Sequence, residues 1–220
     1  MKKKKQGINE LIKIENFLDY NATLNVEEKT FEKLMFIYSI AIRELETKIN
    51  ILKDEFKMFY DYDLIDHVNT RIKKPESIIG KMNDRGLELT YKEMIQNIND
   101  IAGVRVICSF KKDIFSIKSL IEKFPGIIIL KEKDYVTNPK KSGYSSYHII
   151  AEVPITLSQN SIYVKAEIQI RTMAMDFWAS LEHRMKYKPK GEVDKKMSKE
   201  WVNYAKIINK MDNKIMLLNS

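Results

Sequence analysis

The connection 138–148, "NPKKSGYSSYH", gathers cations, hydroxyls and an aromatic ring between two apolar runs. The ring of Tyr144, which follows a glycine, can lie flat against a nucleotide base. Lys140 and His148 can contact phosphate or ribose oxygens, and Lys133 supplies another cation just upstream. Taken alone, Tyr144 is equally well explained as a loop aromatic that packs on the core.

Two carboxylates lie at predicted strands on either side of this connection. Asp100 precedes the β-branched run 101–110, and Glu167 lies within 163–171, "YVKAEIQIR". A period of two residues places the polar residues of the second strand on one face: Lys165, Glu167, Gln169 and Arg171. A solvated strand face, and a turn aspartate before a strand, are the ordinary explanations. If the two strands are neighbours, the carboxylates can instead hold Mg²⁺ and leave positions open for phosphate.

A basic segment over 71–81, "RIKKPESIIGK", precedes both strands. It opens a helix at its proline, and Ser77 and Lys81 lie four residues apart on one face of that helix. With Arg71 and Lys73 close by, the amides of the helix start suit a polyphosphate. The alternative is a basic helix that faces solvent.

Two further charged residues stand in apolar surroundings. Arg105 lies inside the run 101–110, and Asp176 lies near the start of a helix predicted over 173–188. The helix dipole favours an acid in a first turn, which alone explains Asp176. Its carboxylate can also accept hydrogen bonds from the N–H groups of guanine, which adenine does not offer in that arrangement.

The composition limits the class of protein. The 220 residues carry a formal net charge of +8, which favours anionic partners such as nucleotides, RNA or anionic lipid. Cys108 is the one cysteine and lies in an apolar run, so we expect core packing and a reducing, cytoplasmic setting. No apolar run approaches the ~18 residues of a membrane span, so we expect no membrane partner. The N-terminal "MKKKK" is expected to be a solvated tail, with contact to single-stranded RNA as the alternative.

The order of the elements predicts an α+β fold in a single domain over 1–220. A helix over 27–59 has apolar residues at the 3.6-residue period, and short β-branched runs predict strands. We expect a mixed, mostly antiparallel sheet of four or five strands flanked by helices. The expected subdivision is an N-terminal helical region over 8–60, a motif-bearing core over 67–188 and a final helix over 198–218.

Together and in this order, four stretches resemble the synthetase domain of the RelA/SpoT family. They are "RIKKPESIIGK", "DIAGVRV", "KDYVTNPKKSGYSSYH" and "EIQIRTMAMDFWASLEH", and the resemblance runs from about Arg71 to Lys188. It implies a nucleotidyltransferase-like fold and a GTP pyrophosphokinase, which moves the β,γ-pyrophosphate of ATP to the 3′-hydroxyl of GTP or GDP. The implied products are AMP and pppGpp or ppGpp, and the implied cofactor is Mg²⁺.

The resemblance also implies roles on the donor side. Arg71 and Arg105 match the arginines that hold the adenine from both sides. The residues that match the ATP-phosphate group are Lys73, Ser77 and Lys81. Asp100 and Glu167 match the Mg²⁺ ligands, and Glu167 also matches the acid that takes the proton from the attacking 3′-oxygen.

On the acceptor side, Tyr144 matches the tyrosine that stacks on guanine, and Asp176 falls where the family places Asn or Asp near that base. The residues that match those around the phosphates and sugar are Lys133, Lys140 and His148. Gln169, on the same strand face as Glu167, is expected to contact the acceptor as well. Ser145 stands where family members often have Arg, so we expect a weaker hold on the acceptor phosphates and leave the GTP-versus-GDP preference open.

No His-Asp hydrolase motif is found, because Asp66-His67 has the reverse order. The chain therefore resembles a small alarmone synthetase, a stand-alone synthetase, and such proteins are commonly homotetramers. An apolar stripe of the final helix is one candidate interface, and the long first helix is another; each also suits packing within the monomer. The stripe consists of Trp201, Ala205, Ile208 and Ile215.

Two other functions stay open. A non-catalytic module that binds nucleotides or RNA would use the cations and Tyr144 equally well. It leaves Asp100 and Glu167 unexplained, because carboxylates repel phosphate unless a metal intervenes. A nucleotidyltransferase of related fold would release pyrophosphate in place of AMP.

Overall fold

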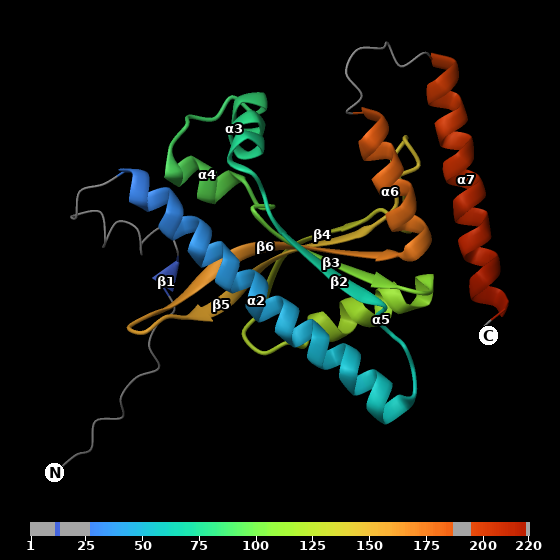
Figure 1. Cartoon of the computed structure of the whole chain (residues 1–220), viewed down its shortest axis with the longest axis horizontal. Helices are drawn as coiled ribbons and strands as arrows, with labels where there is room; N and C mark the ends of the chain where they lie inside the picture. Colours follow the sequence, from blue (N-terminus) through green and yellow to red (C-terminus); the bar gives the residue numbers. More distant parts are fainter. Residues whose placement is uncertain (1–11, 14–26, 187–194, 219–220) are drawn as a thin grey trace.

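A mixed sheet of five longer strands and one two-residue strand forms the centre of the molecule, in a computed structural model that describes residues 12–13, 27–186 and 195–218 (Figure 1). The strands lie in the order β2-β3-β6-β5-β4. Their bounds are β2 His67–Ile72, β3 Ala102–Cys108, β4 Ile128–Asp134, β5 Tyr147–Thr156 and β6 Ser161–Thr172. Only β3 and β6 are parallel among these neighbours. The predicted α+β fold, with a mixed and mostly antiparallel sheet in a single domain, is confirmed.

The central strand β6 alternates between the core and the opposite face of the sheet. Its buried apolar residues are Ile162, Val164, Ala166, Ile168 and Ile170. Between them lie the half-buried Lys165, Glu167 and Gln169. The period of two residues therefore predicted correctly which side chains face away from the core.

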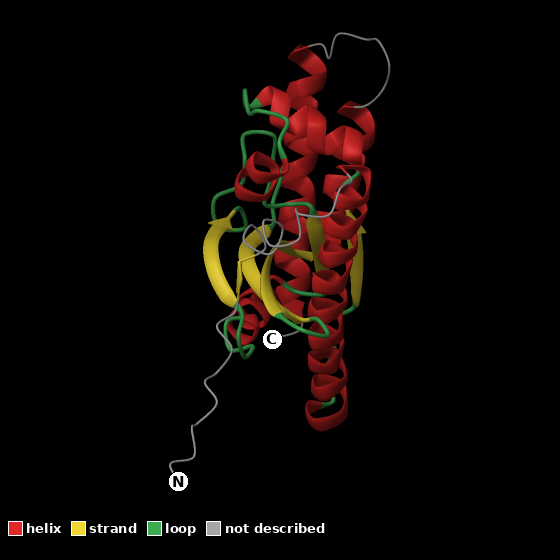
Figure 2. Cartoon of the chain, turned by 90° about the vertical axis from the view of Figure 1, so that its left-hand side faces the viewer, coloured by secondary structure: helices red, strands yellow, loops and turns green. Residues whose placement is uncertain are grey.

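Two helices cover the apolar face. The long helix α2 (Glu27–Tyr60) crosses over the strands, as Figure 1 shows, and Figure 2 shows it running alongside the sheet. Its residues Leu34, Ala41, Leu45 and Ile49 are fully buried. Helix α5 (Lys111–Ile121) adds Ile114, Ile117 and Ile121 to the same cluster. Burial at this spacing is what an amphipathic helix on a sheet requires.

Helices α3 (Pro75–Asp84) and α4 (Tyr91–Asn97) connect β2 to β3. Pro75 lies in the first turn of α3, as expected, and its missing N–H would have no partner there in any case. At the start of α4 the Thr90 hydroxyl accepts a hydrogen bond from the Glu93 amide. This connection places Lys73 and Lys81, two of the predicted phosphate-binding residues, next to Asp100 at the start of β3.

Helices α6 (Met173–Lys186) and α7 (Lys195–Leu218) lie side by side at one end of the sheet (Figure 1). The rings of Trp178 and Trp201 are 5.1 Å apart, and Ala205 is buried. Asp212 of α7 accepts a hydrogen bond from the Thr172 hydroxyl at the end of β6. Most of the stripe expected to form an interface thus packs within the chain.

Three expectations need correction or fall outside the described part. Ile12–Lys13 form a short strand, β1, paired with the start of β6, and are not part of a helical region over 8–60. Residues 8–11, 14–26 and 187–188, which the predicted regions include, lie outside the described residues. The final helix begins at Lys195, three residues before the expected start. None of the helices in the described ranges is long and apolar enough to cross a membrane.

Candidate functional site

One row of the sheet carries a polar side chain on every strand. The paired positions, in order across the sheet, are Asn69, Arg105, Gln169, His148 and Lys133. The next row contains Arg71, Gly103 and Glu167 in register. Gly103 leaves room there, since a Cβ atom at this position would lie 3.4 Å from Cγ of Arg71. The strand pairing therefore gathers residues from distant parts of the sequence on one face.

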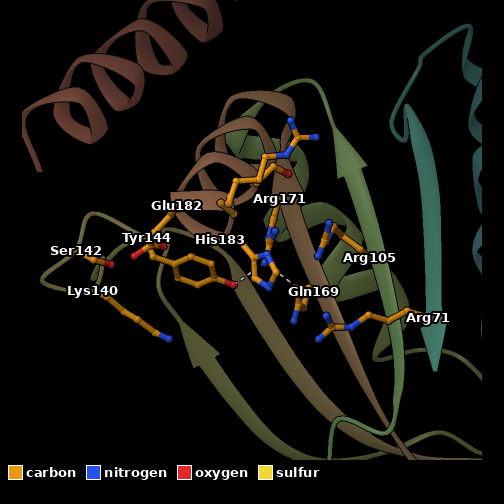
Figure 3. A pocket seen from close by; sticks show the side chains of 12 residues that line it. Arg71, Arg105, Lys140, Ser142, Tyr144, Gln169, Arg171, Glu182 and His183 are labelled. Carbon is orange, nitrogen blue, oxygen red and sulfur yellow. Dashed lines mark hydrogen bonds between the residues drawn. The ribbon is translucent and has the colours of Figure 1, made fainter. Parts of the chain in front are cut away.

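A cavity of about 520 Å³ opens above this face (Figure 3). Arg71 and Arg105 reach it from the strands, while Lys140 and Tyr144 reach it from the loop on the other side. Gln169 lies between the two groups. The predicted adenine and guanine residues are thus brought to opposite sides of a single cavity large enough for nucleotide bases.

Asp100 lies beside the first of these groups and is bound by two lysines. Lys73 Nζ and Lys81 Nζ lie 2.9 Å and 2.8 Å from its Oδ2. Burial opposes ionisation of this carboxyl, but the hydrogen bonds from Lys81 and Lys73 outweigh it, so the pKa of Asp100 is lowered. Its other oxygen, Oδ1, is buried and has no hydrogen-bond partner in the described part of the chain. Ser77 is exposed in the first turn of α3 and does not line the cavity.

Glu167 is held from both sides. His148 Nδ1 lies 2.9 Å from Oε1, and Gln169 Nε2 donates to Oε2 at 2.8 Å. Burial would raise the pKa of Glu167, and the nearby Asp100 also acts in that direction. The hydrogen bonds from His148 and Gln169 prevail and lower it. At neutral pH Glu167 is therefore an ionised carboxylate with fixed orientation.

The aromatic side of the cavity is a cluster of rings and cations. Lys140 Nζ lies 4.7 Å from the ring centroids of both Tyr135 and Tyr144. The Tyr144 hydroxyl is 2.8 Å from His148 Nε2, and Arg171 Cζ is 5.2 Å from the Tyr144 ring centroid. The ring of Tyr144 thus lies close to two cations. The same ring is suited to stacking against a nucleobase. Lys133 is exposed on β4 beside His148 and does not line the cavity.

Asp176, expected near guanine, lies beside two arginines. Its Oδ1 accepts a hydrogen bond from Arg171 Nη1 at 2.9 Å and forms an ion pair with Arg105 Nη1 at 3.1 Å. Burial and the nearby Arg171 lower the pKa of Arg105, and Asp176 opposes this effect. The carboxylate is therefore the counter-ion of two arginines on the neighbouring strands β3 and β6.

Several cavity residues carried no functional assignment from the sequence. Arg171 continues the alternating polar face of β6, which was the one available signal. Helix α6 contributes a wall consisting of Ala179, Ser180, Glu182, His183 and Arg184. Ser145, which stands where family members often have Arg, is buried and faces a small space next to Ala205 and Asp212 of α7. Its side chain therefore lies away from the cavity, and its effect on the acceptor phosphates is not direct.

The comparisons with known proteins agree with this geometry. The model of the family described as "Region found in RelA / SpoT proteins" matches residues 70–192, more than half of the chain. The chain belongs to the RelA/SpoT family.

Individual relatives of this RelA/SpoT chain are similar over most of their length. GTP pyrophosphokinase YwaC of Bacillus subtilis is 43% identical over 83% of this chain and 87% of its own. The crystal structure of small alarmone synthetase 1 from Bacillus subtilis, bound to its product pppGpp, matches with a TM-score of 0.80 at 29% identity. That match covers 87% of this chain and 97% of the other. Small alarmone synthetase 2 of the same organism is 39% identical with a TM-score of 0.78, over 86% and 97% of the two chains.

Proposed function

We propose that this protein is a GTP pyrophosphokinase that transfers the β,γ-pyrophosphate of ATP to the 3′-hydroxyl of GDP or GTP. The products are AMP and ppGpp or pppGpp. The observation that carries the proposal is Glu167, an ionised carboxylate fixed between two hydrogen-bond donors on the sheet face below the cavity. Arg71 and Arg105 lie on one side of that cavity, and Tyr144 with Lys140 lies on the other. Two different nucleotides can therefore be held there, with Glu167 between them as the catalytic base.

On the donor side, we assign Arg71 and Arg105 to the adenine. The ammonium groups of Lys73 and Lys81 both contact Asp100, and we assign them to the triphosphate. Ser77, at the start of α3, adds a hydroxyl to this group. Their positive charges offset part of the negative charge that two nucleotides bring into one site.

On the acceptor side, we assign Tyr144 to stacking on the guanine. Lys140 lies over the same ring, and Gln169 lines the cavity. Their positions support the assignment of both residues to the sugar and phosphates of the acceptor nucleotide. His148 and the exposed Lys133 complete the acceptor group. Asp176 is also assigned to the guanine, and a hydrogen bond from Arg171 holds its carboxylate in place.

In the transfer step, the carboxylate of Glu167 accepts the proton of the 3′-hydroxyl as its oxygen attacks the β-phosphorus of ATP. The bond between that phosphorus and the oxygen bridging to the α-phosphate breaks, and AMP leaves with the bridging oxygen. Because no covalent intermediate with the protein is needed, alignment and charge neutralisation supply most of the acceleration.

The donor set fits a Mg²⁺ ion shared with the phosphates. The orphan Oδ1 of Asp100 is the kind of buried oxygen that a cation satisfies, and Glu167 is its electrostatic neighbour. Within the described residues no group of three or more His, Cys, Asp or Glu is arranged for a metal, which is compatible with an ion held by one or two carboxylates plus substrate phosphates. Bound there, Mg²⁺ would neutralise developing charge on the transferred group.

The test is a transfer assay with Mg²⁺, γ-labelled ATP and either GDP or GTP. We expect label on the guanine nucleotide and an equal amount of AMP, and we expect Glu167→Gln to bind both nucleotides without turnover. Pyrophosphate release in place of AMP would indicate a nucleotidyltransferase. Nucleotide binding without any transfer would indicate a binding module, and a salt-dependent shift assay with single-stranded RNA tests that alternative.

We also infer a homo-oligomer, with a tetramer as the expected state. Helix α7 exposes a second apolar stripe at a spacing of three to four residues: Tyr204, Ile207, Met211 and Ile215. Helix α2 exposes Met58, Phe59 and Tyr60. The buried free thiol of Cys108 and the use of ATP and GTP support a cytoplasmic location.

A further inference from the structure

Five side chains, one of them Glu167, form a closed ring of hydrogen bonds. On one branch Arg171 Nη2 donates to the Tyr144 hydroxyl at 2.6 Å, and that hydroxyl is 2.8 Å from His148 Nε2. His148 Nδ1 is 2.9 Å from Glu167 Oε1. On the other branch Arg171 Nη2 donates to Gln169 Oε1 at 2.7 Å, and Gln169 Nε2 donates to Glu167 Oε2 at 2.8 Å. Both branches therefore begin at one guanidinium nitrogen and end on one carboxylate.

With His148 as a neutral imidazole, the chemistry of the two ends fixes the direction of every bond between them. A guanidinium can only donate and a carboxylate can only accept. The Tyr144 oxygen therefore accepts from Arg171 and gives its own hydrogen to His148 Nε2. His148 must then carry its proton on Nδ1, which it donates to Glu167. Replacing the donor at the start would leave both the hydroxyl of Tyr144 and the amide of Gln169 free to turn.

Arg171 is itself locked in place. Its side chain is 5% exposed, its Nε donates to the Ser146 hydroxyl at 3.2 Å and its Nη1 donates to Asp176 at 2.9 Å. Because a guanidinium is planar, anchoring Nε and Nη1 fixes where Nη2 points. A lysine has the charge but not this fork, so it cannot satisfy the same four partners.

We propose that Arg171 is a positioning residue that orients the acceptor-stacking Tyr144 and the base Glu167 together, through this ring. The proposal rests on the proposed function and adds a residue to it. The guanidinium touches neither reacting atom. It sets the hydroxyl direction of the tyrosine and the tautomer of His148, and these hold the carboxylate toward the incoming 3′-hydroxyl. The ring of Tyr144 thus serves binding, and its hydroxyl serves catalysis.

The first experiment separates those two parts of one residue. Tyr144→Phe keeps the ring and removes the link between Arg171 and His148, so we expect kcat to fall about ten- to a hundredfold with little change in the KM for GDP. Tyr147→Phe is the matched control. It removes the hydroxyl of the neighbouring tyrosine, which donates to Glu132 and lies outside the ring, and kcat is expected to stay unchanged.

The second variant is Arg171→Lys, combined with Tyr144→Phe in a double-mutant cycle. Because both changes break the same ring, we expect their effects on kcat to be less than multiplicative, with the KM for ATP within about twofold of the wild type. Unfolding temperatures identify a variant that has simply lost its fold; in that case Tyr144→Phe alone decides. Wild-type kcat in Tyr144→Phe, or fully multiplicative effects, would overturn the proposal.

A readout that needs no turnover keeps this proposal separate from the proposed function. The sequence has only three histidines, so ¹⁵N NMR can assign the tautomer of His148 directly. We expect the Nδ1–H form in the wild type and in Tyr147→Phe, and a loss of that preference in Arg171→Lys. The Nε2–H form in the wild-type protein contradicts the ring even if the enzyme is active. A wild-type protein with the Nδ1–H form and no transfer contradicts the function and leaves the ring intact.

Discussion

At Asp100 two lysine ammonium groups share one carboxylate oxygen, and the other is buried with no hydrogen-bond partner among the residues that the structure describes. Removing the charge of Asp100 removes a strong ligand for a cation at this point of the donor site. We therefore expect Asp100→Asn to lower kcat/KM by at least about a hundredfold, with no recovery at higher Mg²⁺ concentration. The measurement is a Mg²⁺ titration of the transfer rate, with ATP binding followed in parallel.

Asp84→Asn is a suitable control for that experiment. Asp84 is an exposed acid at the end of α3, so the variant changes the net charge by the same amount outside the site. If Asp100→Asn and Asp84→Asn respond to added Mg²⁺ in the same way, Asp100 is not a ligand of the metal.

The pH dependence at Glu167 has a definite sign. Burial raises the pKa of this carboxyl, but His148 and Gln169 prevail, and the folded-state pKa lies below the ordinary value of about 4.3. Its contribution to stability is thus present above about pH 4.3 and is lost as the pH falls through the lower folded value. The base stays ionised over the same range, so the acid limb of kcat/KM from this group lies below pH 4.3.

Gln169→Leu removes one of the donors that stabilise the carboxylate. The pKa of Glu167 should therefore rise, and the acid limb of the kcat/KM profile should move to higher pH than in the wild type. Each assay is followed by a return to neutral pH, so that reversible protonation is distinguished from acid unfolding. A limb that stays in place or moves to lower pH is incompatible with Gln169 acting on Glu167.

At the level of elements, the loop that carries Tyr144 is braced by α7. Gly143 has φ +85°, and a Cβ atom added there would lie 2.2 Å from Cβ of Ala205. Gly143→Ala combines a strained backbone with a steric clash, and the loop must shift to relieve them. We expect the KM for GDP to rise about tenfold or more, because the strain of a left-handed alanine alone is worth ~1–2 kcal/mol.

The second substitution Ala205→Gly tells the two causes apart. In the double variant the clash is gone but the positive φ remains, so the KM for GDP should recover only in part. Ala205→Gly alone leaves Gly143 unstrained and serves as the baseline. Full recovery would assign the whole effect to the contact with α7, and no recovery would assign it to the backbone of the loop.

The elements were largely predictable from the sequence, because each depends on a local pattern. The alternation of 163–171 predicted which face of β6 is buried, and the 3.6-residue period predicted α2. Ile12–Lys13 could not be predicted, because two residues carry no period and are a strand only through pairing with β6. The position of α7 likewise depends on tertiary contacts such as Asp212 with Thr172.

The site was predictable where the residue type is itself the signal. Carboxylates and arginines inside apolar strands, such as Glu167 and Arg105, stand out in any reading of the sequence. The residues that a side chain contacts in the folded protein do not stand out in this way. For Asp176, which was expected at guanine, the two ion pairs with arginines were not predictable, since no local pattern shows that Arg105 and Arg171 approach it from different strands. Ser145 faces α7 for the same kind of reason.

For the whole molecule, the apolar stripe left exposed on α7 is the feature that bears on assembly. Ile207 and Met211 are 63% and 50% exposed, which is unusual for two such residues a helical turn apart. We expect the double substitution Ile207→Glu and Met211→Glu to convert the protein into a smaller species, measured by light scattering after size exclusion. Lys206→Glu and Lys210→Glu on the neighbouring exposed face is the matched control. An unchanged mass in the first variant places any interface elsewhere.

The position of β6 in the sheet has a consequence for how the protein is made. β6 is the last of the five long strands in the chain, yet it lies between the pair β2–β3 and the pair β5–β4. During synthesis the two antiparallel pairs can form early, but each keeps an open edge until residues 161–172 have left the ribosome. At about 5–20 residues per second, roughly 5–20 seconds separate the appearance of β2 from that of β6. Until β6 appears, the edge of β3, and later also the edge of β5, is open to aggregation. The arginine half and the tyrosine half of the site then lie on separate pieces, without the carboxylate that joins them.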